Sequence, residues 1–403
     1  MREVVVLGAG VVGMTTAYTL ARNGFRVKVI DAATAPGEGG ASFGNGAQLS
    51  YTYTDAMASP SLVANLPKYL LGADPALRLK VSLSPRFMVW GLRFLANATQ
   101  RSFEKNTIDV LKLAMESRNG FAELAGKIEF DHRSPGKLNL YATDESMHHA
   151  EVLSRLKNQH GAGQVLLTPE EAIRKEPALA HYGHSFVGAL WAPLDEAGDS
   201  RLFCKALQRH LEVEYGVRFM LRTKVDKLVK RGGKLRALVT DAGEFPTDRA
   251  VIALGVSAPP IARTVGVRLP IWPVQGYSIT IPATCNAPTA SVTDTARKTV
   301  FCRIGDRLRI AGLADIGPGR AIFKQARFET LLETAKRIFP KAGNYDGEVN
   351  SWTGQRPMTP NSQPIVGPSK VGGLFLNCGH GSLGWTLSMA TAEKMSEQMG
   401  SFS

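Results

Sequence analysis

The sequence predicts an α/β fold, in which a Rossmann-like dinucleotide-binding domain starts at the first residue and receives an inserted α+β domain. Three observations support this prediction. Residues 2–31 have the pattern of a strand, a glycine turn, a helix and a second strand, which make a complete βαβ unit. Strand patterns return at 217–254 and at 270–315. The chain then ends with a strand, a glycine loop and a helix over 374–398.

Length and composition exclude several classes of protein. The 403 residues are 44% hydrophobic and 21% charged, which suits a folded protein of about two domains. The four cysteines form no Cys-x-x-Cys pair, so we expect no metal site, no disulfide scaffold and a reducing, cytoplasmic compartment. We expect no signal peptide, because the apolar run at residues 4–13 lacks a basic n-region and a small-residue cleavage site. We expect no spanning helix, because no apolar run reaches the ~20 residues that a bilayer requires.

The net charge of +13 is concentrated in one hydrophobic stretch. Between Lys68 and Lys105, seven basic residues are opposed by two acidic ones, and the same stretch holds hydrophobic segments at 62–71 and 87–95. This combination suits an anionic lipid surface better than a nucleic acid backbone. The sequence therefore favours a peripheral contact of residues 62–105 with the inner face of the cell membrane, and no nucleic acid partner. The alternative is two packed amphipathic helices with a solvated basic rim.

The first and last elements both belong to one α/β domain, so we expect that domain to be discontinuous. Its predicted segments are 1–60, 165–265 and 345–403. The predicted substrate-binding or cap domain comprises 61–164 and 266–344.

Capping signals predict where three elements begin or end. Gly24 closes the first helix. Thr168 begins a Thr-Pro-Glu-Glu sequence, which is a capping box with proline at the first helical position. Asp199 or Ser200 opens a helix that runs to about Tyr215.

The first functional motif is the glycine turn GAGVVG at residues 8–13. Gly8 permits a tight turn, Gly10 allows close approach of a pyrophosphate, and Gly13 lets the helix pack against the sheet. Asp31 ends the next strand, where its carboxylate can accept hydrogen bonds from a ribose. A glycine-rich turn in an unrelated α/β protein is the alternative, which the surrounding strand–helix–strand pattern disfavours. The motif alone does not separate NAD from FAD.

Two more glycine-rich stretches are candidates for cofactor contact. Residues 41–50 offer small residues for close approach, and Ser42, Asn45 and Gln48 can form hydrogen bonds; a mobile surface loop is the alternative. Residues 377–385 join a strand to a helix through glycines, and the helix amides can stabilise negative charge on a reduced ring. Within this stretch we expect His380 to contact the cofactor by shape and hydrogen bonding rather than to act as a base.

Arg356 is the candidate for binding a substrate carboxylate. It lies in the sequence Gly-Gln-Arg-Pro-Met-Thr-Pro at residues 354–360, where two prolines stiffen the backbone. A rigidly held guanidinium binds a carboxylate through two parallel hydrogen bonds. The alternative is an ordinary surface ion pair.

In this order, the motifs resemble those of the D-amino acid dehydrogenase branch of the FAD flavoproteins, which also include glycine, sarcosine and D-amino acid oxidases. The resemblance runs from Val4 to Met399 and includes the stretch Pro-Val-Gln-Gly-Tyr-Ser-Ile-Thr at 273–280. The chain departs from the family at residues 45–47, Asn-Gly-Ala in place of Asn-Ala-Gly, and at 359–362, Thr-Pro-Asn-Ser in place of Thr-Pro-Asp-Gly. The resemblance implies a glutathione-reductase-type, D-amino acid oxidase-like fold.

FAD is the cofactor that the resemblance implies. Its implied contacts are Gly8, Gly10, Val11, Val12, Gly13, Asp31, Ser42, Asn45, Gln48, Leu49, Val225, Gly255, Gly379, His380, Gly381, Leu383 and Gly384. Of these, Val225 would meet adenine through its backbone, and Gly255 ends a strand whose Ala-Leu-Gly resembles the Ala-Thr-Gly of two-dinucleotide flavoproteins. Arg356 would hold the substrate carboxylate, and Tyr51, Tyr53 and Tyr277 are further candidates for the substrate pocket.

The implied activity is oxidative deamination of a D-amino acid. A hydride passes from the α-carbon to flavin N5, and the imino acid hydrolyses to a 2-oxo acid and ammonia. The electrons would go to a quinone or another carrier rather than to oxygen. Two alternatives remain: an oxygen-using glycine, sarcosine or D-amino acid oxidase, or a proline or hydroxyproline dehydrogenase. From another class, a basic RNA-associated flavoprotein is a more remote alternative.

Overall fold

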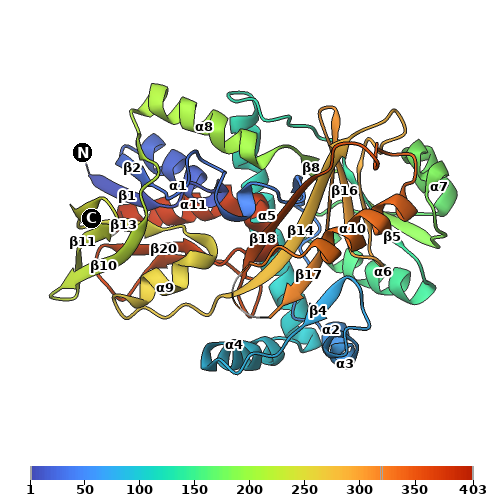
Figure 1. Cartoon of the computed structure of the whole chain (residues 1–403), viewed down its shortest axis with the longest axis horizontal. Coiled ribbons are helices and arrows are strands. Elements are labelled where there is room, and N and C mark those ends of the chain that lie inside the picture. Colours follow the sequence, from blue (N-terminus) through green and yellow to red (C-terminus); the bar gives the residue numbers. More distant parts are fainter. Residues whose placement is uncertain (1, 318, 320, 402–403) are drawn as a thin grey trace.

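The computed structural model describes residues 2–317, 319 and 321–401; residues 1, 318, 320, 402 and 403 of the predicted domain segments lie outside it. Its first sheet has six strands in the order β19-β20-β13-β1-β2-β9, all parallel except β19 at the edge (Figure 1). In chain order these strands are β1 (Glu3–Leu7), β2 (Arg26–Ile30), β9 (Arg218–Met220), β13 (Ala250–Ile252), β19 (Ile365–Pro368) and β20 (Leu374–Cys378).

Both faces of this sheet are covered, as a parallel sheet requires. On one face Val4 and Val6 join a core with four helices, and on the other Val5 and Leu7 pack under an antiparallel meander. The helices are α1 (Val11–Arg22), α5 (Gln100–Ala125), α8 (Ser200–Tyr215) and α11 (Gly384–Ser401). The meander consists of β10 (Val225–Arg231), β11 (Lys234–Thr240) and β12 (Gly243–Pro246), beside the short helix α9 (Ala258–Arg263). The hydrophobic run of β1 therefore lies in two cores at once.

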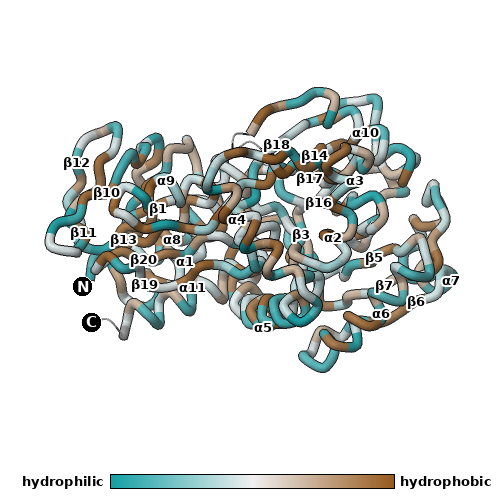
Figure 2. Tube along the Cα trace, turned by 90° about the horizontal axis from the view of Figure 1, so that it is seen from below, coloured by the Kyte–Doolittle hydropathy of each residue, from teal (hydrophilic) through white to brown (hydrophobic). Residues whose placement is uncertain are grey.

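The second sheet has nine strands and forms the other half of the molecule (Figures 1 and 2). Its order is β18 (Asn350–Met358), β14 (Trp272–Pro282), β17 (Arg307–Ile316), β16 (Thr299–Ile304), β15 (Ser291–Asp294), β5 (Lys137–Tyr141), β7 (Gly188–Ala192) and β6 (Val165–Leu167), with β4 (Leu77–Leu79) on β17. Helix α10 (Gln325–Ile338) packs on β14 and β17, and α6 (Asp144–Asn158) and α7 (Pro169–Lys175) lie near β5–β7. The short strands β3 (Gln48–Leu49) and β8 (Glu196–Ala197) pair with each other.

The sheets divide the chain differently from the predicted segments at two places. Strands β6 and β7 lie in the predicted segment 165–265, yet they pair with each other and β7 pairs with β5 of the second sheet. Strand β18 lies in the predicted segment 345–403, yet it pairs with β14 along nine residues. Strand pairing is decided by partners far away in sequence, which a strand pattern does not name. The domain assignment as a whole stays a prediction.

The predicted helix boundaries are confirmed. Gly24 has a φ of +83° after α1, Thr168 forms the capping box of α7 with Glu171, and the Asp199 side chain caps α8. The basic hydrophobic stretch forms α2 (Pro60–Ala64), α3 (Leu66–Leu70) and α4 (Pro85–Ala96), at the lower edge of the molecule in Figure 1. Within the described ranges, no helix has both the length and the apolar character needed to cross a bilayer.

Candidate cofactor and substrate site

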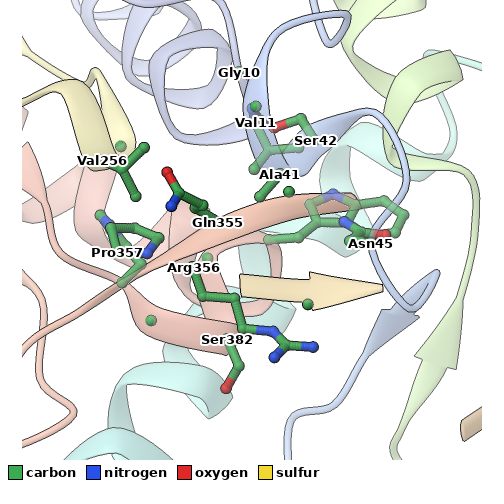
Figure 3. Close-up of a pocket in the computed structure, with 18 of the residues that line it drawn as sticks. Gly10, Val11, Ala41, Ser42, Asn45, Val256, Gln355, Arg356, Pro357 and Ser382 are labelled. Atoms are coloured by element: carbon green, nitrogen blue, oxygen red, sulfur yellow. Dashed lines mark hydrogen bonds between the residues drawn. The ribbon is translucent and has the colours of Figure 1, made fainter. Parts of the chain in front are cut away.

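A cavity of about 1200 Å³ is lined from both sheets and by residues far apart in sequence (Figure 3). One part lies at the carboxyl ends of β1, β2, β13 and β20, beside the N-terminus of α1. Another part is lined by residues of β14, β17 and β18. Ligands of α/β proteins bind outside the carboxyl ends of the parallel strands, which is where this cavity lies.

The glycine turn at residues 8–13 can be built only from glycine at two of its positions. A Cβ on Gly13 would lie 1.8 Å from the carbonyl oxygen of Gly8, so α1 packs on the turn without a side chain between them. Gly8 has a φ of +110°, and a Cβ there would lie 2.5 Å from the Ala253 oxygen. The amide of Val11, at the start of α1, donates to Ser42 Oγ (3.0 Å). Ser42 occupies this amide, while the N-terminus of α1 lies on the cavity wall at Gly10 and Val12, where the positive end of the helix dipole favours a phosphate.

Asp31 is held by two backbone amides. Its Oδ2 accepts from Ala9 N (2.6 Å) and its Oδ1 from Ala33 N (2.7 Å), so the carboxylate bridges the ends of β1 and β2. Asp31 lines the cavity, and each oxygen retains a lone pair for a ligand hydroxyl.

The segment 41–50 is bound to the second sheet and is not a free surface loop. Three side chains of this sheet donate to backbone carbonyls of the segment: Ser278 Oγ to Gly44 (2.6 Å), Arg309 Nη1 to Asn45 (2.9 Å) and Cys302 Sγ to Ala47 (3.3 Å). These bonds hold Ser42, Asn45 and Gln48 on the cavity wall.

Gln48 has one polar atom without a partner. Its Oε1 accepts from Lys137 Nζ (3.0 Å) and Ser50 Oγ (3.3 Å), whereas its Nε2 is inaccessible to solvent and has no acceptor among the described residues. A buried amide donor without an acceptor is rare in folded proteins and points to a ligand. Together with the glycine turn and the fixed Asp31, it fits a dinucleotide that carries a polar ring, as FAD does.

Lys137 is a cavity residue that the sequence did not reveal. It begins β5, its exposure is 1%, and its Nζ also donates to Ser50 Oγ (3.2 Å) and lies 4.1 Å from the ring centre of Tyr53. Burial lowers its pKa to about 8. A single lysine at the start of a strand pattern usually faces solvent, so only its partners across the sheet could have identified it.

Arg356 extends from β18 into the cavity (Figure 3). It lies opposite Val274 of β14, and a Cβ on neighbouring Gly276 would come within 2.5 Å of its Nη2. Its guanidinium donates one long hydrogen bond, to Leu313 O (3.4 Å), and no carboxylate of the described chain lies within ion-pair distance. Burial lowers its pKa. The surface ion pair that was the alternative is therefore absent from this part of the chain, and the cation is available to an anionic ligand.

The three candidate tyrosines have different environments. Tyr53 and Tyr277 line the cavity, but the Tyr277 hydroxyl donates to Asp315 Oδ2 (2.8 Å). Tyr51 is not among the lining residues, and its hydroxyl donates to Glu196 (3.2 Å). Burial raises the pKa of all three phenols, so they are neutral hydrogen-bonding groups near pH 7.

His380 lies in the loop before α11, with its ring Nε2 3.0 Å from Thr391 Oγ1. Its exposure is 3%, and burial lowers its pKa to about 3. The imidazole is therefore neutral at pH 7 and bonded to α11, which agrees with a structural contact rather than a base.

Most of the predicted residues line this one cavity. They are Gly8, Gly10, Val11, Val12, Asp31, Ser42, Asn45, Gln48, Tyr53, Val225, Gly255, Tyr277, Arg356, His380, Gly381, Leu383 and Gly384. Gly13, Leu49 and Gly379 do not line it. Gly13 packs on Gly8, Leu49 is buried in the hydrophobic core on a strand that contacts α11, and a Cβ on Gly379 would meet Thr359 at 2.7 Å. These three residues therefore pack against neighbouring parts of the chain and do not contact the cavity.

The fold and the cavity define an FAD-dependent oxidoreductase. A model of the family described as FAD dependent oxidoreductase (DAO) matches residues 3–398, and the chain belongs to this family. Two similar curated proteins are named D-amino acid dehydrogenase. The one from Methylobacterium sp. (strain 4-46) is 38% identical over 98% of this chain and 94% of its own length. The one from Rhizobium johnstonii is 36% identical over 99% and 96%.

Solved structures share the fold over the whole chain. The L-proline dehydrogenase from P. horikoshii superposes with a TM-score of 0.77 at 20% identity, covering 100% of this chain and 94% of that one. The glycine oxidase from Geobacillus kaustophilus gives 0.74 at 22% identity, covering 100% and 95%. The predicted Rossmann-like flavoprotein fold, FAD as cofactor and oxidoreductase activity are confirmed.

Proposed function

We propose that this enzyme oxidises D-amino acids to 2-oxo acids and ammonia, and passes the electrons to a quinone or another carrier rather than to oxygen. The observation that carries the proposal is Arg356, whose guanidinium has no carboxylate partner among the described residues and lies in the same cavity as the glycine turn. The names of the curated relatives support the D configuration and the dehydrogenase reaction.

The residues of this chain would bind and orient the substrate. Arg356 holds the α-carboxylate through two charge-assisted hydrogen bonds, which fixes the direction of the α-hydrogen. The side chains of Tyr53 and Leu313 line the same cavity and would limit the space around the side chain of the substrate. FAD, when bound, accepts the hydride equivalent from the α-carbon. The proton of the ammonium group leaves before or with that step, and the imino acid is then hydrolysed by water.

A panel of D- and L-amino acids, including proline, hydroxyproline, glycine and sarcosine, tests this proposal. With an artificial dye as acceptor, we expect the purified enzyme to oxidise D-amino acids at least ~10-fold faster than their L-enantiomers, a difference of about 1.4 kcal/mol in activation free energy. With oxygen alone we expect no stoichiometric peroxide. Equal rates for both enantiomers, or peroxide release at the rate of turnover, would contradict the proposal.

We also propose that the face formed by α3, α4 and their connection binds an anionic bilayer. Helix α4 buries Phe87, Trp90 and Phe94, yet its opposite side is apolar as well. Exposed large hydrophobic residues cluster here: Leu70, Leu71, Val81, Leu83, Met88, Val89, Leu92 and Leu95. Exposed basic residues surround them: Lys68, Arg78, Lys80, Arg86, Arg93 and Arg101. A helix with two apolar sides and a basic rim has the chemistry of an interfacial membrane contact, where a quinone acceptor is also found.

Vesicle flotation tests the membrane contact. We expect the wild-type enzyme to float with phosphatidylglycerol vesicles and to do so less at high salt, because the basic rim contributes electrostatically. The triple variant L71E/L83E/L92E should remain at the bottom, since each buried leucine contributes about 2 kcal/mol. The control V213E changes a residue of α8 that is 78% exposed and should float normally. Flotation of the triple variant, or none of the wild type, would contradict the contact.

A further inference from the structure

Four strands of the second sheet each provide a donor to the segment 44–50. Ser278, Arg309 and Cys302 bind its backbone carbonyls, whereas Lys137 of β5 binds only side chains, those of Gln48 and Ser50. Cys302 lies opposite Arg309 in the β16–β17 pair, whereas β15 separates β16 from β5 and places Ser291 opposite Lys137. Lys137 is therefore the one of these four donors that controls a side-chain orientation rather than a backbone path.

The contact with Lys137 decides which way the Gln48 amide is turned. An ammonium group carries only donors, so the carbonyl end of the amide must face it. Ser50 Oγ donates to the same oxygen, which reinforces this orientation. As a consequence the amide NH₂ points away from Lys137, and this is the group that finds no acceptor among the described residues.

A buried ammonium group such as that of Lys137 lowers the stability of the fold, which suggests that it is retained for a function. Its ammonium is buried without a carboxylate at ion-pair distance in the described chain. The nearby Lys157 is buried to the same degree, yet it is paired with Asp55 and donates to Thr52 O (3.1 Å). A buried cation without a counterion is destabilising and tends to be found at functional sites.

We propose that Lys137 is a positioning residue of the FAD site, which fixes the side-chain amide of Gln48 so that its NH₂ group is available to an acceptor on the flavin. The inference concerns cofactor binding and does not depend on which substrate is oxidised. If the enzyme does not oxidise D-amino acids, FAD affinity and the flavin spectrum still test this inference.

The test is a double-mutant cycle on the holoenzyme, with the visible absorption spectrum of the bound flavin and the dissociation constant of FAD as readouts. We expect K137M and Q48L each to weaken FAD binding about 10-fold, the loss of one hydrogen bond of about 1.4 kcal/mol, and to shift the flavin spectrum in the same direction. The double variant should resemble Q48L alone, because Lys137 acts through Gln48. K137R, which keeps the charge and the donors, should retain the wild-type spectrum.

Two further variants separate positioning from folding. Q48E keeps the shape and the contact with Lys137 but lacks the NH₂ group, so it should melt like the wild type and bind FAD as weakly as Q48L. K157M removes the other buried lysine, which has no contact with Gln48, and should lower the melting temperature without changing the flavin spectrum. The inference is overturned if K137M has its full effect in the Q48L background, if Q48E binds FAD normally, or if K157M reproduces the spectrum of K137M.

Discussion

Replacing Arg356 with leucine should lower kcat/KM for D-amino acids by about 100- to 1,000-fold, mostly through KM, while FAD stays bound. The guanidinium is buried, has no carboxylate partner in the described chain and makes a single long hydrogen bond to Leu313 O. Its loss leaves the substrate carboxylate without a counterion in a cavity, which costs about 3–4 kcal/mol. Steady-state kinetics with a dye acceptor measure this effect, and the flavin absorbance shows that the cofactor is retained.

Two variants give this experiment its controls. R356K keeps a positive charge but loses the two-pronged geometry, so we expect an intermediate loss. R337L removes an arginine of α10 that is 75% exposed and should leave the kinetics unchanged. Unchanged kinetics in R356L would remove Arg356 from the substrate site, and loss of flavin would assign it to the cofactor instead.

Replacing Gly13 with alanine should produce a protein that is purified without bound FAD and is less stable by about 3 kcal/mol. The added Cβ would lie 1.8 Å from the Gly8 carbonyl oxygen, and backbone cannot rotate away as a side chain end can. Helix α1 must therefore move off the sheet, and its N-terminal amides move with it. Flavin absorbance of the purified protein and urea unfolding measure the two effects.

The matched control is another glycine-to-alanine change in a helix. Gly91 of α4 has no neighbour within 4 Å of the position where a Cβ would be added. G91A should keep FAD and be unchanged or slightly more stable, because alanine favours helix over glycine. A yellow, normally stable G13A protein would show that α1 is not held against the turn as tightly as the distance indicates.

The sequence was most informative where a few neighbouring residues decide the structure. The glycine turn at 8–13 and the cap at Thr168 were predictable, because their geometry depends on contacts within a few residues. The close packing of α1 on the turn at Gly13 also follows from the motif alone. Arg356 could be singled out because the two prolines that follow it predict a rigid backbone.

Sequence patterns were least informative where partners are distant in the chain. Strand β18 pairs with β14, and β7 pairs with β5, so both belong to the second sheet. The predicted segments had placed both strands in the domain of the first sheet. Lys137 and Gln48 are 89 residues apart, and nothing in either neighbourhood announces their contact. Such pairs follow from which strands lie side by side.

By itself the sequence determined the dinucleotide turn and the α/β class, and it singled out Arg356 as the candidate for binding a carboxylate. Those features depend on local backbone geometry and on the chemistry of single side chains. Only the tertiary structure decided that the arginine has no counterion in the described chain, that a buried lysine turns the Gln48 amide, and that α4 is apolar on both sides. Each of these depends on what surrounds a side chain, and burial and pairing arise only when the two sheets come together.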